Sequence, residues 1–140
     1  MDNYKHTIQY YETDKMGITH HSNYIRFMEE ARVYFLKNNG FPYEKFEEEG
    51  AISPVVSITC DYKKTTTFPD ELEIEVSVLD ISPVKFKLSY AMTVDGLLAC
   101  SATSTHCFLS QDGRPVNIKK QYPEFFEVLS RLKETPDRQG

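Results

Sequence analysis

Three side chains capable of acid–base or nucleophilic chemistry lie close together near the start of the chain. Asp14, His20 and His21 occupy one connector, and the amphipathic segment that begins at Ser22 predicts a helix directly after it. A helix N-terminus presents unpaired backbone N–H groups and about half a positive charge. We therefore expect the connector to place an acid beside N–H groups that can stabilise an oxygen becoming negative during a reaction.

Asp14 allows two chemical roles in such a site. Its carboxylate can take a proton from water as a general base, or it can attack a carbonyl as a nucleophile. In either case the N–H groups near His21 would stabilise the resulting oxyanion. A single aspartate before a helix is also typical of a turn or capping residue. The motif alone therefore leaves catalysis by Asp14 as a hypothesis.

The adjacent histidines raise the question of a metal site, with Asp14 or His106 as a further ligand. Neighbouring side chains on an extended segment point to opposite sides, so both rings reach one ion only if the chain bends. We expect no metal, with one ring in the site and the other packed elsewhere. The sequence contains no phosphate-binding glycine loop and no dinucleotide fingerprint, so no cofactor is expected either.

Length and charge exclude several classes of protein. The 140 residues fit a single domain over 1–140, and a net charge of −5 argues against nonspecific binding to nucleic acid or to an anionic membrane. No apolar run approaches the roughly 18 residues of a membrane span. Three cysteines without metal spacing are typical of reduced, partly buried thiols. We expect a soluble cytoplasmic protein without membrane insertion.

The elements that position the site follow from the spacing of apolar residues. Three- and four-residue spacing predicts a helix over 22–38, with Ser22 as its N-cap and with Tyr24, Phe27, Met28, Ala31, Tyr34 and Phe35 on its buried face, widened by Ile25 and Leu36. The charged residues are expected on a solvated face, with Glu29 or Glu30 as a possible exception: Arg26, Glu29, Glu30, Arg32 and Lys37.

Alternating apolar residues predict strands over 4–10, 52–63, 71–79, 84–94 and 97–109. The pair Asp95-Gly96 indicates a two-residue hairpin between the last two strands. Short helices are predicted over 42–49 and from Pro123. One long helix with five strands indicates an α+β fold, in which an antiparallel sheet curls around that helix.

Lys63 and Lys64, followed by three threonines, form the best local patch for a phosphate group. An ordinary solvated strand end explains the same residues. The lysines are therefore candidate substrate-binding residues.

The connector also carries a resemblance to a known family. The segment from Asp14 to Tyr24, Asp-Lys-Met-Gly-Ile-Thr-His-His-Ser-Asn-Tyr, followed by Arg26 to Arg32, resembles the signature of hotdog-fold acyl-CoA thioesterases of the 4-hydroxybenzoyl-CoA thioesterase type. The similarity extends through Asp70-Glu-Leu and the later strands, over about residues 4–125.

This resemblance implies an antiparallel sheet wrapped around a long central helix, in dimers and often homotetramers whose active sites lie at the dimer interface. It implies that Asp14 is the catalytic carboxylate and that the backbone N–H of His21 polarises the thioester carbonyl, with the His21 ring in the same site. The motif also assigns Gly17, Asn23 and Tyr24 to substrate binding.

Two features depart from the family pattern. Close members often have a proline and a basic residue where this chain has Thr65 and Thr67, so Lys63 and Lys64 are expected to contact the coenzyme A phosphates instead. Another branch of the fold uses a glutamate of the central helix, which keeps Glu29 and Glu30 as alternative catalysts.

The sequence thus predicts an acyl-CoA thioesterase that releases a free carboxylic acid and coenzyme A. Its partners would be an acyl-CoA or an acyl carrier protein, with no nucleic acid. A noncatalytic acyl-CoA-binding module and a hotdog hydratase or dehydratase are the alternatives. The identity of the acyl group does not follow from the sequence.

Overall fold

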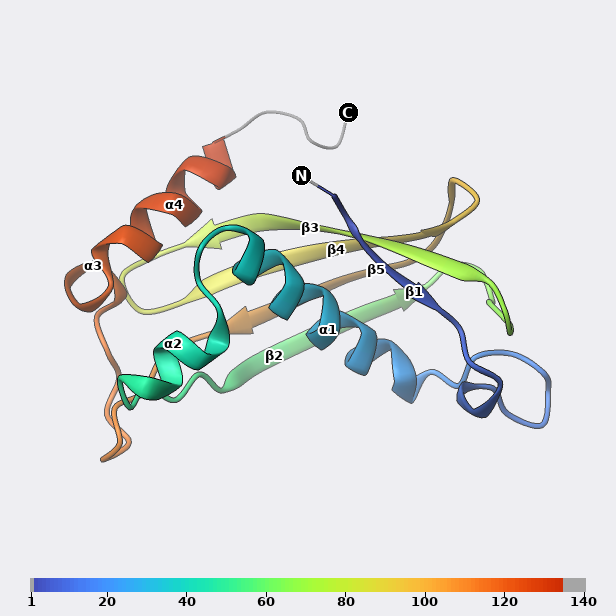
Figure 1. The fold of residues 1–140 in the computed structure, drawn as a ribbon, viewed down its shortest axis with the longest axis horizontal. Helices are drawn as coiled ribbons and strands as arrows, with labels where there is room; N and C mark the ends of the chain where they lie inside the picture. Colours follow the sequence, from blue (N-terminus) through green and yellow to red (C-terminus); the bar gives the residue numbers. More distant parts are fainter. Residues whose placement is uncertain (1, 135–140) are drawn as a thin grey trace. The chain divides into compact units, whose positions relative to one another are not determined.

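Alternating apolar residues form most of the strands where the sequence predicts them. The computed structural model describes residues 2–134. Its strands are β1 (Tyr4–Thr7), β2 (Val55–Tyr62), β3 (Glu71–Ile81), β4 (Phe86–Val94) and β5 (Leu97–His106) (Figure 1). The helices are α1 (Ser22–Asn38), α2 (Tyr43–Glu48), α3 (Ile118–Gln121) and α4 (Pro123–Glu134), with a short 3₁₀ turn, η1 (Tyr10–Glu12).

The strands form one antiparallel sheet in the order β1-β3-β4-β5-β2. In the β1–β3 pair, Tyr4 faces Ile74 and Thr7 faces Glu71. Between β2 and β5, Lys63 N–H donates to the Ala99 carbonyl and Thr59 contacts Thr103, so residue numbers rise in one strand as they fall in the other. The predicted α+β class with an antiparallel sheet is confirmed.

The predicted hairpin lies between β4 and β5. Asp95 and Gly96 have φ angles of 51° and 79°, which is the combination that a tight two-residue turn between twisted strands requires. The strand predicted over 4–10 is shorter. Ile8 N–H still donates to the Asp70 carbonyl, in register with the β1–β3 pair, and η1 then turns the chain from Tyr10 onward.

The chain divides into two compact units. The first contains the residues up to Phe35 with 60–76 and 90–102, and the second contains 36–59, 77–89 and the residues from Thr103 onward. Strands β2 to β5 each contribute residues to both units. A single domain over 1–140 stays a prediction, and its residues 1 and 135–140 lie outside the described part.

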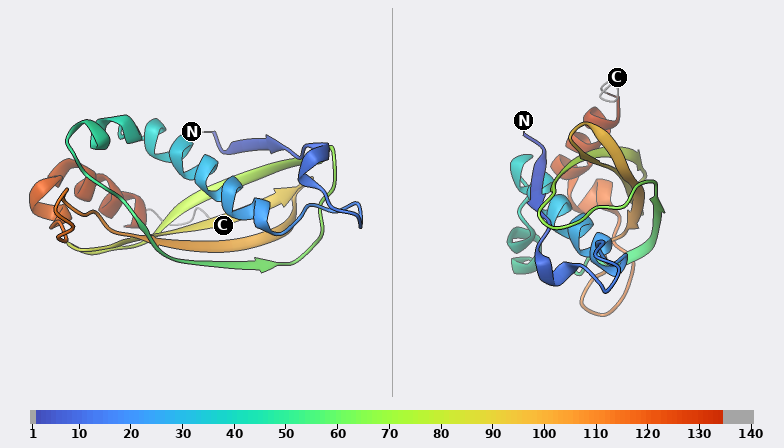
Figure 2. Two further views of the ribbon diagram at one scale, coloured as in Figure 1. Left: turned by 90° about the horizontal axis from the view of Figure 1, so that it is seen from below. Right: turned by 90° about the vertical axis from the view of Figure 1, so that its right-hand side faces the viewer.

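In the first unit, the apolar face of α1 forms much of the core. Tyr24, Phe27, Met28 and Ala31 are at most 3% exposed, in the helical spacing that the sequence shows. The Cys60 Sγ of β2 lies 3.6 Å from the Met28 Sδ. Burying a side chain such as Phe27 contributes about 1.5–3 kcal/mol. Figure 2 shows the connector leading from β1 into the N-terminal end of this helix.

Two helix residues differ from the sequence-based expectation. Arg32, predicted on the solvated face, is 5% exposed, and its Nη1 donates to the Tyr90 hydroxyl at 3.1 Å. It lies four residues after Met28 and therefore on the same face. Ile25, predicted to widen the buried face, is 47% exposed because it lies two residues before Phe27 and therefore near the opposite side of the helix.

The second unit has an aromatic core. The rings of Phe41, Phe46, Phe86 and Phe108 surround Phe125 at centroid distances of 5.2 to 5.7 Å. Phe125 and Leu129 of α4 are both buried, one turn apart. None of the helices within residues 2–134 combines the length and the apolar character needed to span a membrane.

Candidate active site

Asp14 begins a tight turn in the connector. Asp14 N–H donates to the Ile18 carbonyl at 2.9 Å, and Gly17 N–H donates back to the Asp14 carbonyl at 2.9 Å. Gly17 has a φ of 81°, which favours glycine, and Thr13 bridges to Thr19 just outside the turn. The connector is thus a small hairpin with the predicted catalytic acid at its tip.

The two carboxylate oxygens of Asp14 are in different situations. Oδ1 accepts the backbone N–H of Met16 at 2.8 Å and holds the turn. Oδ2 accepts no hydrogen bond from any residue between 2 and 134. The side chain is half-buried. Asp14 is therefore both a turn residue and a carboxylate with one oxygen available for chemistry.

The backbone N–H groups at the start of α1 differ in whether they have an acceptor among residues 2–134. Ser22 N–H points to the His20 Nδ1 at 3.3 Å, Asn23 N–H donates to the His20 carbonyl, and Tyr24 N–H donates to the His21 carbonyl. The N–H of His21 donates to no group within the described residues. Ser22 is the first residue of the helix and not its N-cap, so the available donor lies at His21.

The two histidine rings lie against each other at a tilt and not on opposite sides as predicted. Their centroids are 4.3 Å apart with a 33° angle between the planes. The expectation assumed an extended segment, whereas the chain already turns into α1 at His20. Both side chains are exposed, and the His20 Nδ1 also lies 2.9 Å from the Ser22 hydroxyl. His106, the other candidate ligand, is buried and stacks on Phe86 in the second unit.

Tyr24, in the first turn of α1, is buried and its hydroxyl is enclosed. It is 3% exposed, and its Oη lies 2.8 Å from the Thr66 Oγ1, which in turn lies 2.7 Å from the Thr19 Oγ1. Burial raises the pKa of the Tyr24 hydroxyl. Thr66 thus joins the helix to the connector, and nothing in its sequence context distinguishes it from Thr65 or Thr67.

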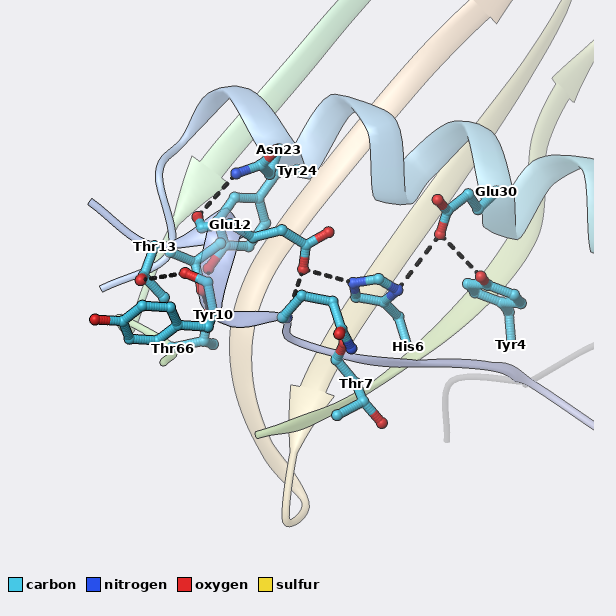
Figure 3. A network of polar contacts seen from close by, with 12 residues as sticks. Tyr4, His6, Thr7, Tyr10, Glu12, Thr13, Asn23, Tyr24, Glu30 and Thr66 are labelled. Atoms are coloured by element: carbon cyan, nitrogen blue, oxygen red, sulfur yellow. Dashed lines mark hydrogen bonds and ion pairs between the residues drawn. The ribbon is translucent and has the colours of Figure 1, made fainter. Parts of the chain in front are cut away.

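Asn23 and Gly17 are held by neighbouring segments of the first unit. The Asn23 Nδ2 donates to the Glu12 carbonyl at 2.9 Å (Figure 3), and the Thr67 hydroxyl donates to the Gly17 carbonyl at 2.7 Å. His20 N–H also donates to the Glu12 carbonyl. These bonds bring the connector, the start of α1 and the loop after β2 together.

The two predicted lysines follow β2 directly. The backbone N–H groups of Lys63 and Lys64 both donate to the Ala99 carbonyl, at 2.8 and 3.1 Å, and both side chains are exposed. The same loop continues to Thr66 and Thr67, which contact the connector. The lysines therefore belong to a segment that is hydrogen-bonded to the hairpin of Asp14.

Tyr62 is a neighbour of the site that the sequence did not single out. Its ring lies 5.2 Å from Tyr24 and 6.3 Å from the His21 ring, and its hydroxyl points to the His21 carbonyl at 3.4 Å. Burial and the neighbouring Cys60 raise the pKa of Tyr62 to about 12. In the sequence, only its position on β2 next to the lysines could have indicated that Tyr62 lies near Tyr24 and His21.

The two glutamates kept as alternative catalysts have different surroundings. Glu29 is exposed. Glu30 Oε1 accepts the Tyr4 hydroxyl at 2.8 Å and lies 3.5 Å from the His6 Nδ1, while the other ring nitrogen of His6 lies 2.9 Å from the Glu12 Oε1 (Figure 3). Glu30 is thus already engaged. Within residues 2–134 no group of three or more His, Cys, Asp or Glu side chains could hold a metal ion.

Comparison with known proteins identifies the family. The thioesterase-like superfamily matches residues 8–137 of the chain. The chain belongs to the thioesterase-like superfamily. This confirms the resemblance seen in the Asp14–Arg32 segment, and with it the assignment to the thioester hydrolases and to the hotdog fold.

Two solved structures and one sequence relative are similar to this chain over most of its length. A DHNA-CoA thioesterase from Staphylococcus aureus is 28% identical, with a TM-score of 0.90 over 94% of this chain and 90% of that one. A hypothetical protein of Aquifex aeolicus is 37% identical, with a TM-score of 0.83 over 90% and 97%. The acyl-CoA thioesterase YbgC of Haemophilus influenzae is 25% identical over 87% of this chain and 91% of that protein.

Proposed function

We propose that this protein is an acyl-CoA thioesterase that hydrolyses its substrate to a free carboxylic acid and coenzyme A. One observation carries the proposal. The hairpin connector presents a carboxylate oxygen of Asp14 and the backbone N–H of His21, and neither is occupied by a described residue. The names of the thioesterases from S. aureus and H. influenzae support a coenzyme A thioester as substrate.

The reaction uses these two groups in different ways. The His21 N–H donates to the thioester carbonyl oxygen and stabilises the negative charge that develops there. Asp14 takes the proton from an attacking water, or it attacks the carbonyl carbon itself and forms an anhydride that water then opens. In both routes a C–O bond forms, the C–S bond breaks, and the sulfur leaves as thiolate and is then protonated.

The remaining predicted residues bind and shape the substrate site. Lys63 and Lys64 attract the coenzyme A phosphates with their exposed ammonium groups. Gly17 and Asn23 shape the two ends of the connector. Tyr24 contributes through its ring and through the Thr66 contact, because its hydroxyl is enclosed.

The proposed assembly is a homodimer or homotetramer, formed through β2. This strand is at one edge of the sheet. Val55, Val56 and Tyr62 on it are 43–48% exposed, and an exposed apolar edge strand is a template for pairing with a second copy. Sedimentation at micromolar concentration should show two or four times the 16.2 kDa of one chain. A fully active species of one chain would contradict an interface site.

The three cysteines support the proposed cytoplasmic location. Cys60, Cys100 and Cys107 are free, as expected where thiols are kept reduced. Burial, with the neighbouring Cys60, raises the pKa of the Cys100 thiol to about 12, so this thiol stays protonated and unreactive at neutral pH.

A hydrolysis screen tests the proposed function. The protein is incubated with a panel of acyl-CoAs and with acyl groups on an acyl carrier protein, and the free thiol is measured with a colour reagent. We expect thiol release from coenzyme A substrates. Binding without thiol release indicates the noncatalytic module. Addition of water to an enoyl-CoA without thiol release indicates the hydratase.

A further inference from the structure

We propose that Glu12 is a positioning residue of this site, and that His6 and Glu30 hold it in place. The inference rests on the proposed thioesterase function and adds three residues that lie outside the segment from Asp14 to Tyr24. The proposed role of the three residues is to orient the His21 N–H, which has no acceptor among residues 2–134. None of the three residues needs to touch the substrate.

The backbone of Glu12 fixes the chain on both sides of the donor. Its carbonyl oxygen accepts His20 N–H and the Asn23 Nδ2, each at 2.9 Å. The N–H of His21 belongs to the peptide group that begins at the His20 carbonyl. A single oxygen of Glu12 therefore holds the residue before this peptide and the first turn of the helix after it. A shift of Glu12 would rotate the donor away from the thioester oxygen.

The side chain of Glu12 is fixed in turn by two donors. It is 3% exposed, and its Oε1 accepts Gln9 N–H at 2.8 Å and lies 2.9 Å from the His6 Nε2. The His6 ring packs at a tilt against Phe27 of α1, with centroids 4.3 Å apart and 36° between the ring planes. Glu12 is thus tied to β1 by a hydrogen bond and, through the ring of His6, to the buried face of the helix.

Glu30 holds the opposite side of the His6 ring. Its Oε1 lies 3.5 Å from the His6 Nδ1 and accepts the Tyr4 hydroxyl at 2.8 Å (Figure 3). Burial and the adjacent Glu30 raise the pKa of Tyr4 to about 12, so this hydroxyl remains a donor at neutral pH. The titratable groups around the ring are therefore Glu12 from η1, Glu30 from α1 and Tyr4 from β1 itself.

Packing alone does not account for these residues. A buried carboxylate is costly to desolvate, and apolar side chains of similar volume often stabilise a core equally well. Hydrogen bonds to charged groups are directional, unlike apolar contacts, so they fix the orientation of the backbone segment that carries them. Here that segment is the peptide bearing the proposed oxyanion donor. The network therefore fits a role in geometry more closely than a role in stability.

The kinetic test compares variants that remove or keep the side-chain hydrogen bond between the Glu12 carboxylate and the His6 ring. Glu12→Leu removes the acceptor, and His6→Phe keeps a ring on Phe27 but removes the donor. We expect each to lower kcat by about 10–100-fold, because a displacement near 1 Å costs that much, and to change KM less than about threefold. Glu12→Gln keeps an oxygen for Gln9 N–H and His6, so it should recover most of kcat.

Tyr4→Phe is the matched control. It removes a side-chain hydrogen bond between β1 and α1 but leaves every contact of Glu12 in place. A purely structural network predicts that kcat per folded molecule stays normal in all variants. A positioning network predicts normal kcat in Tyr4→Phe and a reduced kcat in His6→Phe, even when the two have similar melting temperatures.

Amide hydrogen exchange gives a readout that does not depend on activity. In His6→Phe, and in Glu12→Leu if it folds, the His20 amide should exchange about tenfold faster or more than in the unmodified protein, and in Tyr4→Phe it should not change. Unchanged His20 exchange and unchanged kcat in His6→Phe would overturn the positioning role while leaving the thioesterase assignment intact. Absence of thiol release by the unmodified protein would overturn the proposed function itself.

Discussion

The hairpin connector and the aromatic core of the second unit are built from different interactions. In the connector, backbone N–H groups, carbonyls and threonine hydroxyls are joined at 2.7–3.1 Å, and several side chains are exposed. In the aromatic core, Phe46, Phe108 and Phe125 contact one another through ring faces and edges at 5.0–5.7 Å. The hydrogen bonds of the connector fix the orientation of its backbone groups, and the ring contacts of the aromatic core remove apolar surface from water.

Histidine shows the difference within one residue type. His106 is 1% exposed, stacks on Phe86 and lies 2.6 Å from the Ser104 hydroxyl. His21 is exposed at the start of a helix, and its backbone N–H has no acceptor among residues 2–134. The ring in the core contributes packing, whereas the residue in the connector carries the proposed donor to the substrate. Changes in the two regions should therefore separate activity from stability.

The largest expected effect is on activity, from Asp14→Asn. The amide oxygen can still accept Met16 N–H, so the turn should persist, but an amide is neither a base nor a competent nucleophile. We expect kcat to fall by up to about 10⁴-fold, with a melting temperature within about 2 °C of the parent. Near-normal turnover of the folded variant would contradict the role of Asp14 and would direct attention to Glu29 and Glu30.

Phe125→Ala is expected to lower stability and to leave the turnover of the folded protein unchanged. Removing a ring that contacts four other phenylalanines should lower the free energy of unfolding by about 3–5 kcal/mol. Turnover per folded molecule, measured well below the melting temperature, should stay normal. Phe125→Leu fills more of the space, so it gives a milder loss if the alanine variant does not fold. A large loss of kcat in the folded leucine variant would show that the regions are not separable.

Replacing the amide of residue 21 by an ester tests the backbone donor directly. Semisynthesis exchanges the N–H for an oxygen, and loss of one oxyanion-hole donor should lower kcat by about 10²–10³-fold. The matched control is His21→Ala, which keeps the N–H and should lose only about 10–100-fold if the ring assists proton transfer. Unchanged turnover in a folded ester variant would exclude this donor.

The smallest effect is expected at the lysines after β2. Lys63→Ala and Lys64→Ala together should raise KM for an acyl-CoA by about 2–10-fold and leave kcat unchanged, since exposed charges contribute little each. The effect should weaken at high salt. Lys37→Ala, at the end of α1, removes an exposed lysine elsewhere and serves as control. Equal changes in KM for both sets would mean that these lysines make no specific phosphate contact.

Local patterns predicted the elements well because each depends on nearby residues. The period of the apolar residues predicted α1 with its end at Asn38, and alternation predicted the buried face of β3 at Leu72, Ile74 and Val76. The hairpin at Asp95-Gly96 followed from backbone preference alone. The roles of Asp14 and His21 stay predictions that the geometry supports.

Tertiary partners explain what the sequence did not show. Arg32 is buried because Tyr90, 58 residues away, accepts its hydrogen bond. Thr66 matters because Thr19 and Tyr24 lie against it, 47 and 42 residues away. Glu12 gives no sign of burial until His6 and Gln9 are placed around it. Such contacts appear only after the chain has folded, so residue type and spacing do not encode them locally.

The turn at Asp14 also has an entropic consequence. Its hydrogen bonds to Ile18, Gly17 and Met16 are all formed within five residues, so the loop that carries the acid is closed by its own chain. The conformational entropy of ordering that loop is then lost when the protein folds and not when each substrate molecule arrives. If Asp14 is the catalytic acid, as proposed, its backbone is already ordered before each substrate molecule binds.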